Sequence, residues 1–151
     1  LFMEFDKLEF ETTFKNGDMI PIEYTGYGKN ISPEFRIKNL SDRAKSLVII
    51  LEDLSHPIKN FTHWIAWNIK ANSVIPESVG NMDNVKQGIA YGFHKYAEAK
   101  PPKFQKHNYR YTVYSLDTIL ELSPNIMKKK LLKAMNGHIL QKGTITGYFK
   151  R

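Results

Sequence analysis

An unbroken apolar run near the middle of the chain places the strongest constraint on its fold. Residues 47–51 read Leu-Val-Ile-Ile-Leu, which is too short for an isolated helix and rich in the β-branched residues that favour strands. Successive side chains of a strand point to opposite faces, so a strand without polar residues must be covered on both of them. We therefore predict a buried central strand over residues 46–53.

Alternating and aromatic segments predict further strands around this one. Residues 8–14 alternate apolar and polar side chains, and a turn at residues 16–18 would allow residues 20–24 to pair back onto them. The stretch 63–69 follows the central strand after a nine-residue loop, so the two should form a wide hairpin. The strands predicted in this way cover residues 8–14, 35–40, 46–53, 63–69, a segment entered from His107, and 144–149.

Two other segments have different patterns. Residues 70–106 contain three prolines and little periodicity, and irregular segments of this length in a compact protein often carry function. Ser123 followed by Pro124 is typical of a helix N-terminus, and apolar residues recur at helical spacing from there until Gly137. We predict one short helix in this region.

Composition narrows the classes of function. The 151 residues include no cysteine, which excludes disulfides, thiolate metal sites and a cysteine nucleophile. The chain also lacks the motifs of phosphate loops, dinucleotide folds, hydrolase elbows and zinc helices. No apolar stretch has the length of a membrane span, and the opening residues are acidic where a signal peptide would be basic. We expect a single domain over residues 1–151, located in the cytoplasm.

The formal net charge of +7 favours anionic partners. Its one dense cluster is Lys128, Lys129, Lys130 and Lys133, which we interpret as the solvated face of the predicted helix. A nucleic-acid or anionic-membrane patch is the alternative, and we do not expect nucleic acid to be a partner. Exposed strand edges are compatible with a homodimer.

Three polar side chains stand at the ends of predicted strands. Asp53 ends the central strand, His63 begins its hairpin partner and His107 begins a third strand. If these strands are adjacent, the three side chains share one mouth of the sheet, where a carboxylate would orient two imidazoles toward a small anion. A metal held by the same three residues is the alternative that spacing alone leaves open. The alternative to a shared site is a structural role, in which Asp53 is a turn residue and His63 is a packed, partly buried side chain.

Six motifs in order resemble the phosphatidylethanolamine-binding protein family, and its short bacterial and archaeal branch in particular, whose members are described as similar to Raf kinase inhibitor protein. They extend over about 110 residues and are Asn-Ile-Ser-Pro from residue 30, residues 46–57, His63-Trp64, Pro101-Pro102, residues 107–117 and Gly-His-Ile-Leu from residue 137. Several motif positions depart from the family pattern: Leu54 and Ser55 in its Asp-Pro-Asp-x-Pro motif, Thr62 before the histidine, and Lys106 and Asn108 in its Pro-His-Arg-Tyr motif.

The resemblance implies a mostly β fold, an antiparallel β-sandwich with Greek-key elements and one or two short helices. It implies that a small pocket at one end binds phosphate or a phospholipid head group, with no cofactor, metal or covalent chemistry. In that pocket His63 and His107 would donate to the anion, while Asp53 would orient one imidazole and accept from a ligand ammonium group. Pro57, Trp64 and Tyr109 would form its walls, and Tyr91 would belong to the glycine-tyrosine loop at its rim.

The resemblance also implies a regulatory role as an inhibitor of a protein kinase or protease. The alternative function, from the residues themselves, is a metal-dependent or His/Asp hydrolase that uses the same pocket.

Overall fold

The computed structural model describes residues 5–96 and 100–151 of the chain. The described part is β-rich with one α-helix. Its strands are β1 (Asp6–Lys7), β2 (Phe10–Glu11), β3 (Phe35–Ile37), β4 (Ser46–Asp53), β5 (Phe61–Lys70), β6 (Val74–Ile75), β7 (Lys86–Gln87), β8 (Lys106–Leu116) and β9 (Ile139–Lys150). Its helices are α1 (Lys128–Met135) and the short 3-10 helices η1 (Ile22–Tyr24) and η2 (Val79–Asn81).

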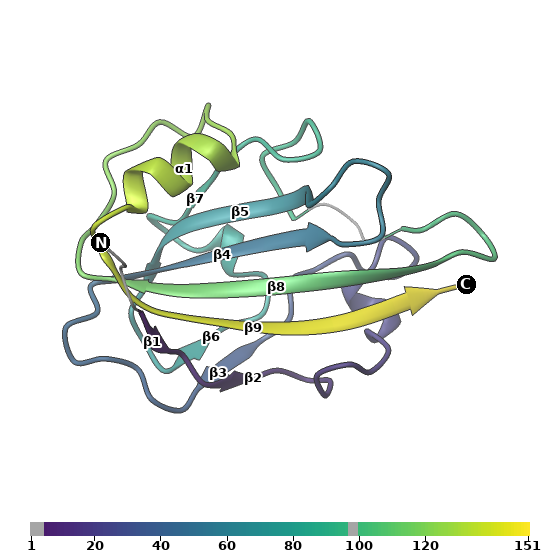
Figure 1. The fold of residues 1–151 in the computed structure, drawn as a ribbon, viewed down its shortest axis with the longest axis horizontal. Helices are drawn as coiled ribbons and strands as arrows, with labels where there is room; N and C mark the ends of the chain where they lie inside the picture. Colours follow the sequence, from purple (N-terminus) through teal and green to yellow (C-terminus); the bar gives the residue numbers. More distant parts are fainter. Residues whose placement is uncertain (1–4, 97–99) are drawn as a thin grey trace.

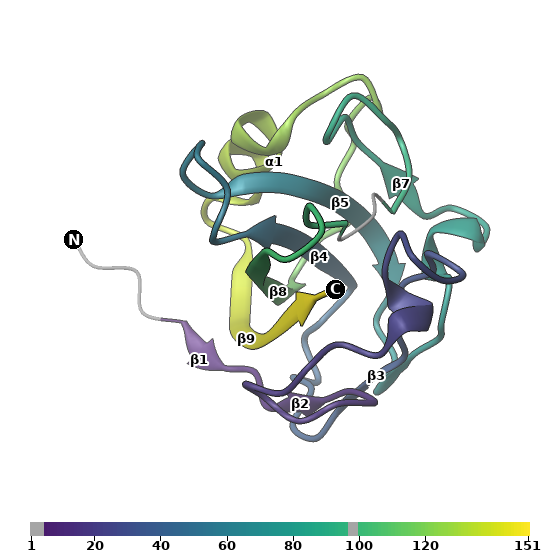
Figure 2. The same cartoon turned by 90° about the vertical axis from the view of Figure 1, so that its right-hand side faces the viewer.

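The strands form two sheets. The larger has the order β1-β9-β8-β4-β5-β7, and the smaller has the order β2-β3-β6. Figures 1 and 2 show the two sheets on opposite sides of the molecule, with α1 lying outside the larger one. The prediction of a mostly β fold is confirmed. The larger sheet is mixed rather than antiparallel throughout, because β1 pairs with β9 in parallel.

β4 is the central strand that the apolar run predicted. All eight of its residues are buried. Leu47, Ile49 and Leu51 pack in the core between the two sheets, while Val48 and Ile50 pack in a second core with Leu131 and Met135 of α1. The strand carries no polar residue between its ends because both of its faces are covered.

The first predicted strand is wrong in extent. Only β1 and β2 form within residues 5–14, because the chain changes sheets there. The Leu8 amide donates to Lys142 O of the larger sheet (3.0 Å), whereas Phe10 pairs with Ile37 of the smaller one. Residues 20–24 do not pair back onto this segment either: Ile20 N donates to Tyr148 O of β9 (2.8 Å), and the rest forms η1.

The C-terminal elements also differ from prediction in their boundaries. α1 begins at Lys128, and the Ser123 hydroxyl accepts from the Asn125 amide in a turn that precedes the helix. The last strand begins at Ile139 rather than at residue 144. The β4–β5 hairpin is confirmed, and the irregular segment 70–106 contributes only two-residue strands and η2 within its described part.

Candidate functional site

The sheet order brings the three predicted strand ends together. β4 lies between β5 and β8, and Asp53 is the direct partner of Phe61 on one side and Tyr109 on the other. His107 precedes Tyr109 by two residues on β8, so its side chain lies on the same face. Asp53 and His107 are therefore neighbours because of strand register alone.

His63 reaches this face through an irregularity in β5. Leu51 pairs with Trp64 and Glu52 pairs with Thr62, which leaves His63 as an extra residue between them. Uninterrupted pairing would set His63 opposite Glu52, on the face covered by α1. A bulge re-aims a side chain in this way, and it turns the His63 ring toward Asp53.

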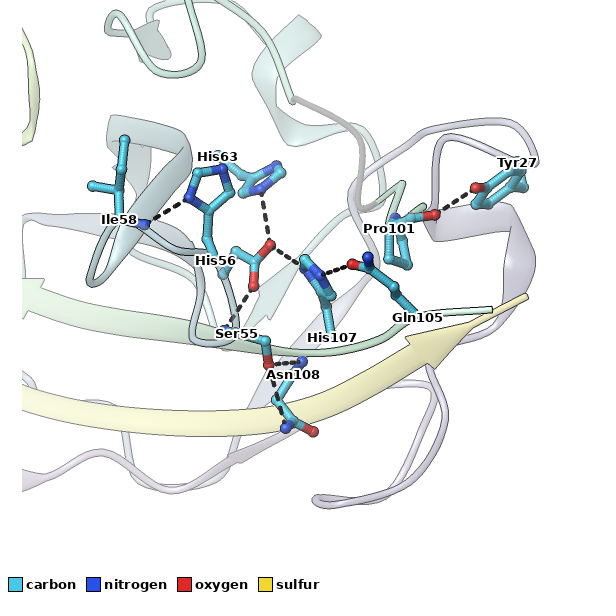
Figure 3. A network of polar contacts seen from close by, with 10 residues as sticks. Tyr27, Ser55, His56, Ile58, His63, Pro101, Gln105, His107 and Asn108 are labelled. Atoms are coloured by element: carbon cyan, nitrogen blue, oxygen red, sulfur yellow. Dashed lines mark hydrogen bonds and ion pairs between the residues drawn. The ribbon is translucent and has the colours of Figure 1, made fainter. Parts of the chain in front are cut away.

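The resulting network is centred on the Asp53 carboxylate, and Figure 3 labels its partners Ser55, His63 and His107. Its Oδ2 accepts from His107 Nδ1 at 2.7 Å and faces His63 Nε2 at 3.8 Å. Its Oδ1 accepts from the Ser55 amide at 2.8 Å. The other ring nitrogen of His107, Nε2, lies 3.2 Å from Gln105 Oε1. The Asp53 side chain is only 3% exposed, so both carboxylate oxygens interact with groups of the protein.

The network keeps Asp53 ionised. Burial by itself raises the pKa of this carboxyl, but the interactions with His63 and His107 and the hydrogen bond from the Ser55 amide outweigh it. Together with the charge of His107 they lower the pKa from 3.8 to about 2. A fixed negative charge therefore orients both imidazoles.

Two polar groups beside Asp53 are buried without a hydrogen-bond partner in the described part of the chain. They are the Tyr109 hydroxyl and the His63 ring, whose Nδ1 and Nε2 both lack a partner within hydrogen-bonding distance. Burial and the Asp53 charge raise the pKa of Tyr109 far above its ordinary value, so its hydroxyl remains a neutral donor. Buried groups of this kind are costly unless a ligand or water completes them.

These groups open into a pocket of about 500 Å³. It is lined by Asp53, Ser55, His56, Pro57, His63, Tyr91, Lys100, Pro101, Pro102, Gln105, His107 and Tyr109. Six of the seven residues predicted for the site thus lie on one pocket. Tyr91 lies at its rim with its ring stacked on His63, with centroids 5.2 Å apart.

Trp64 is the predicted residue that does not line this pocket. It is 1% exposed and packs in the core between the sheets, where its ring meets Tyr96 edge-on. Its Nε1 donates to Gln87 Oε1 at 2.8 Å. The expectation that Trp64 forms a wall is not met, because Trp64 pairs with Leu51, two residues before Asp53, and lies deeper in the core between the sheets.

Four polar lining residues were not predicted from the sequence: Ser55, His56, Lys100 and Gln105. His56 stacks on Phe61 with centroids 4.0 Å apart, and its Nδ1 accepts from the Ile58 amide. Gln105 had a detectable signal, since it precedes His107 by two residues at the entry to β8. The position of His56 could not be predicted, because it depends on the path of the β4–β5 loop.

Among residues 5–96 and 100–151, no group of three or more His, Cys, Asp and Glu side chains is arranged to hold a metal ion. In the pocket His107 contacts Asp53 directly, at hydrogen-bond distance. No helix in this part of the chain is long and apolar enough to cross a membrane.

Comparison with known proteins gives consistent matches. The sequence matches the phosphatidylethanolamine-binding protein profile over residues 10–150. A UPF0098 protein of Pyrococcus horikoshii is 40% identical over 152 residues, covering 95% of this chain and 77% of the relative. The crystal structure of a phosphatidylethanolamine-binding protein homologue from Chlamydia trachomatis superposes with a TM-score of 0.84 at 30% identity, covering 97% of this chain and 99% of that one. Escherichia coli YbcL, described as a member of the mammalian family, shares the fold with a TM-score of 0.84 at 21% identity, over 96% of this chain and 99% of its own.

Proposed function

Since the chain belongs to the phosphatidylethanolamine-binding protein family, we propose that the pocket around Asp53, His63 and His107 binds a small phosphate-bearing anion. The observation that carries the proposal is the pairing of polar groups in the pocket. The His63 ring and the Tyr109 hydroxyl have no hydrogen-bond partner in the described chain, whereas both Asp53 oxygens already interact with the protein.

Because the unpartnered groups of the pocket can donate hydrogen bonds, the pocket favours a ligand that accepts them. Tyr109 can donate, and each histidine has a ring nitrogen that Asp53 does not engage. Lys100 adds a positive charge to the lining. Phosphate oxygens form short, charge-assisted hydrogen bonds with such donors. No covalent step is needed for this role.

The same pairing argues against recognition of a ligand ammonium group by Asp53. Its Oδ1 is bound to the Ser55 amide and its Oδ2 faces both histidines. An ammonium group would have to displace one of these contacts. We therefore expect O-phosphorylethanolamine and inorganic phosphate to bind with similar affinity.

No observation favours the hydrolase alternative over binding. The Ser55 hydroxyl is two residues from Asp53, but it accepts from the Asn108 amide at 2.8 Å and makes no contact with either histidine. It is therefore not arranged as a nucleophile activated by a histidine.

The test is a histidine-observed NMR titration of the native protein with O-phosphorylethanolamine and, separately, with inorganic phosphate. We expect the His63 and His107 resonances to shift together and to saturate as ligand is added. His107→Gln should weaken binding about tenfold, the size expected for one charge-assisted hydrogen bond. His138→Gln is the matched control, because His138 pairs with Asp117 outside the pocket. The absence of a saturable shift at about 10 mM ligand would overturn the proposal.

A further inference from the structure

The positive charge of this protein is concentrated in the last third of its sequence. Residues 100–151 contain eleven lysines and arginines but only two acids, Asp117 and Glu121, whereas residues 1–99 contain eleven basic and thirteen acidic residues. β8, β9 and α1 all lie in the basic third. β8 and β9 are neighbours in the larger sheet (Figure 1). The fold therefore gathers the excess charge on one region.

Within this region, one face of the β8–β9 pair has a one-sided composition. The odd-numbered residues of both strands, such as Tyr109, Tyr111 and Ile145, point into the core between the sheets. The even-numbered residues 106–114 and 142–150 therefore share the opposite face, which we call the ribbon face. Its ten positions comprise four cations, three threonines, two tyrosines and one asparagine, with no acid and no aliphatic residue. Thr112 and Tyr114 are buried, and the other eight are exposed or half-buried.

Of the four cations of the ribbon face, Arg110 pairs with Glu52 across the strands, whereas the three lysines have no carboxylate partner in the described chain. Lys106 and Lys150 are direct cross-strand partners, and like charges opposite each other are destabilising. Lys106 Nζ instead lies 4.3 Å from the Tyr148 ring centroid, and Lys142 Nζ lies 5.7 Å from that of Tyr114. None of these three lysines forms an ion pair with a carboxylate of the described chain.

Glu52 supplies a carboxylate beside this face, and that carboxylate is already paired with two cations. Glu52 points to the same side from β4 and binds Arg110 at 2.9 Å and Lys128 of α1 at 2.7 Å. These residues and Lys142 line a hollow of about 270 Å³ between the ribbon face and α1. Lys106, Lys142 and Lys150 therefore keep an unbalanced positive charge. They lie along a strip about 27 Å long, the length of the nine strand residues 142–150.

We propose that the ribbon face binds single-stranded nucleic acid through its phosphate backbone, without sequence preference. The strip carries lysines at both of its ends to meet phosphates, the exposed Thr144 and Asn108 side chains donate to phosphate oxygens, and the half-buried Tyr148 supplies an aromatic ring beside them. A bilayer is the less suitable partner, because the face has no aliphatic side chain to insert. The site lies on the opposite face of the sheet from the Asp53 pocket and is independent of the function proposed for that pocket.

The proposal replaces the expectation that nucleic acid is not a partner. That expectation considered the lysines of residues 128–133, and Lys128 is in fact bound to Glu52 and to Asn60 O. The lysines of the ribbon face are scattered along the sequence, so no charged run marks them. Strand pairing alone brings them together.

The experiment measures fluorescence anisotropy of a labelled poly-dT or poly-rU oligonucleotide of about twelve nucleotides, long enough to cover the strip. The test variant is the triple substitution Lys106→Gln, Lys142→Gln and Lys150→Gln. The matched control is Lys29→Gln, Lys70→Gln and Lys86→Gln, three exposed lysines of residues 1–99 that change the net charge equally. We expect the test variant to lose at least about tenfold in affinity and to flatten the slope of log Kd against log salt by about 2. The control should stay within about twofold of the native protein, a change too small for a lost phosphate contact.

Three outcomes would overturn the proposal. Equal loss in both triple variants would mean that only net charge matters, and no binding by the native protein at about 50 mM salt would mean that the face binds no nucleic acid. Tighter binding to phosphatidylserine vesicles, abolished by the test variant alone, would identify an anionic membrane as the partner. Thermal unfolding of both triple variants, and an intact phosphate titration at His107, show that any loss does not come from misfolding.

Discussion

Asp53 depends on its neighbours for its charge, since burial alone would favour its neutral form. Its pKa of about 2 in the folded protein lies below the 3.8 of an ordinary aspartate. A depressed pKa contributes stability above the unfolded value, and this contribution is lost as the pH falls through the folded value. We therefore expect Asp53 to contribute about 2 kcal/mol at pH 5, lost between about pH 4 and pH 2.

Urea unfolding at pH 5 and pH 2.5 measures this contribution. Asp53→Asn should be less stable than the native protein at pH 5, and the difference should shrink toward pH 2.5. Asp42→Asn is the control, because Asp42 forms no ion pair within the described chain. A difference that is the same at both pH values would contradict the linkage argument.

Gln105 occupies the position at which a ligand oxygen would meet His107. Its Oε1 lies 3.2 Å from His107 Nε2, the ring nitrogen that Asp53 leaves available. An anion must displace this neutral acceptor, which is worth about 0.5–1.5 kcal/mol. We expect Gln105→Ala to tighten phosphate binding by about two- to tenfold, measured by the same NMR titration. Gln105→Glu should weaken it by placing a carboxylate beside His107. Weaker binding by the alanine variant would instead identify Gln105 as a ligand donor.

At the residue scale, the sequence was sufficient wherever position in a strand determines contact. Asp53, His107 and Tyr109 meet because each occupies a strand end in a regular ladder. The orientation of His63 does not follow from the pattern, since it is the extra residue of β5 and a bulge leaves no reliable mark on hydrophobic alternation. Trp64 was expected at the pocket from the resemblance alone, whereas its pairing with Leu51 places it in the core.

Irregularities in β5 also anchor the neighbouring element. The register shifts again between Leu47 and Ile49, where Asn68 adopts a left-handed φ of 57°. Asn68 Nδ2 donates to Leu120 O at 2.8 Å, and its Oδ1 accepts from the Leu120 amide at 2.9 Å. One side chain therefore fixes the approach of the segment that leads into α1.

Two substitutions at Asn68 separate backbone strain from this anchoring. Asn68→Gly loses both hydrogen bonds but tolerates a positive φ, whereas Asn68→Ala loses both and is strained as well. We expect the alanine variant to be less stable than the glycine variant by about 1 kcal/mol, and both to be less stable than the native protein. Urea unfolding measures both differences. Equal stability of the two variants would show that the positive φ carries no cost.

At the element scale, β4 and its hairpin followed from hydrophobicity alone, whereas the boundaries of α1 did not. Ser123 and Pro124 are typical of a helix N-terminus, yet they lie in a turn before α1. The helix begins at Lys128, from where Leu131 packs in the core between α1 and the larger sheet. Tertiary packing overrides a local capping signal in such cases. The prediction of one strand over residues 8–14 was wrong for a related reason, because Leu8 and Phe10 bond to different sheets.

At the scale of the whole molecule, the basic residues of the last third of the sequence lower the stability of the fold but favour binding of an anionic partner. The direct pairing of Lys106 with Lys150 repels along the end of the β8–β9 pair. A protein under selection for stability alone would be better served by a carboxylate at one of these positions. The arrangement makes physical sense if an anionic partner supplies the missing negative charge.

Lys150→Glu tests this conflict in a single residue. The new carboxylate faces Lys106 across the strands, so we expect the variant to gain about 0.2–1 kcal/mol of stability at low salt. The gain should shrink at about 0.5 M salt, where exposed charges are screened. The same variant should bind the oligonucleotide at least about fivefold more weakly, because one cation is lost and an anion is added. Lys86→Glu makes the same change in charge on β7, at the opposite edge of the larger sheet, and should show neither effect. A variant that loses stability and keeps its affinity would show that the lysine pair serves the fold rather than a partner.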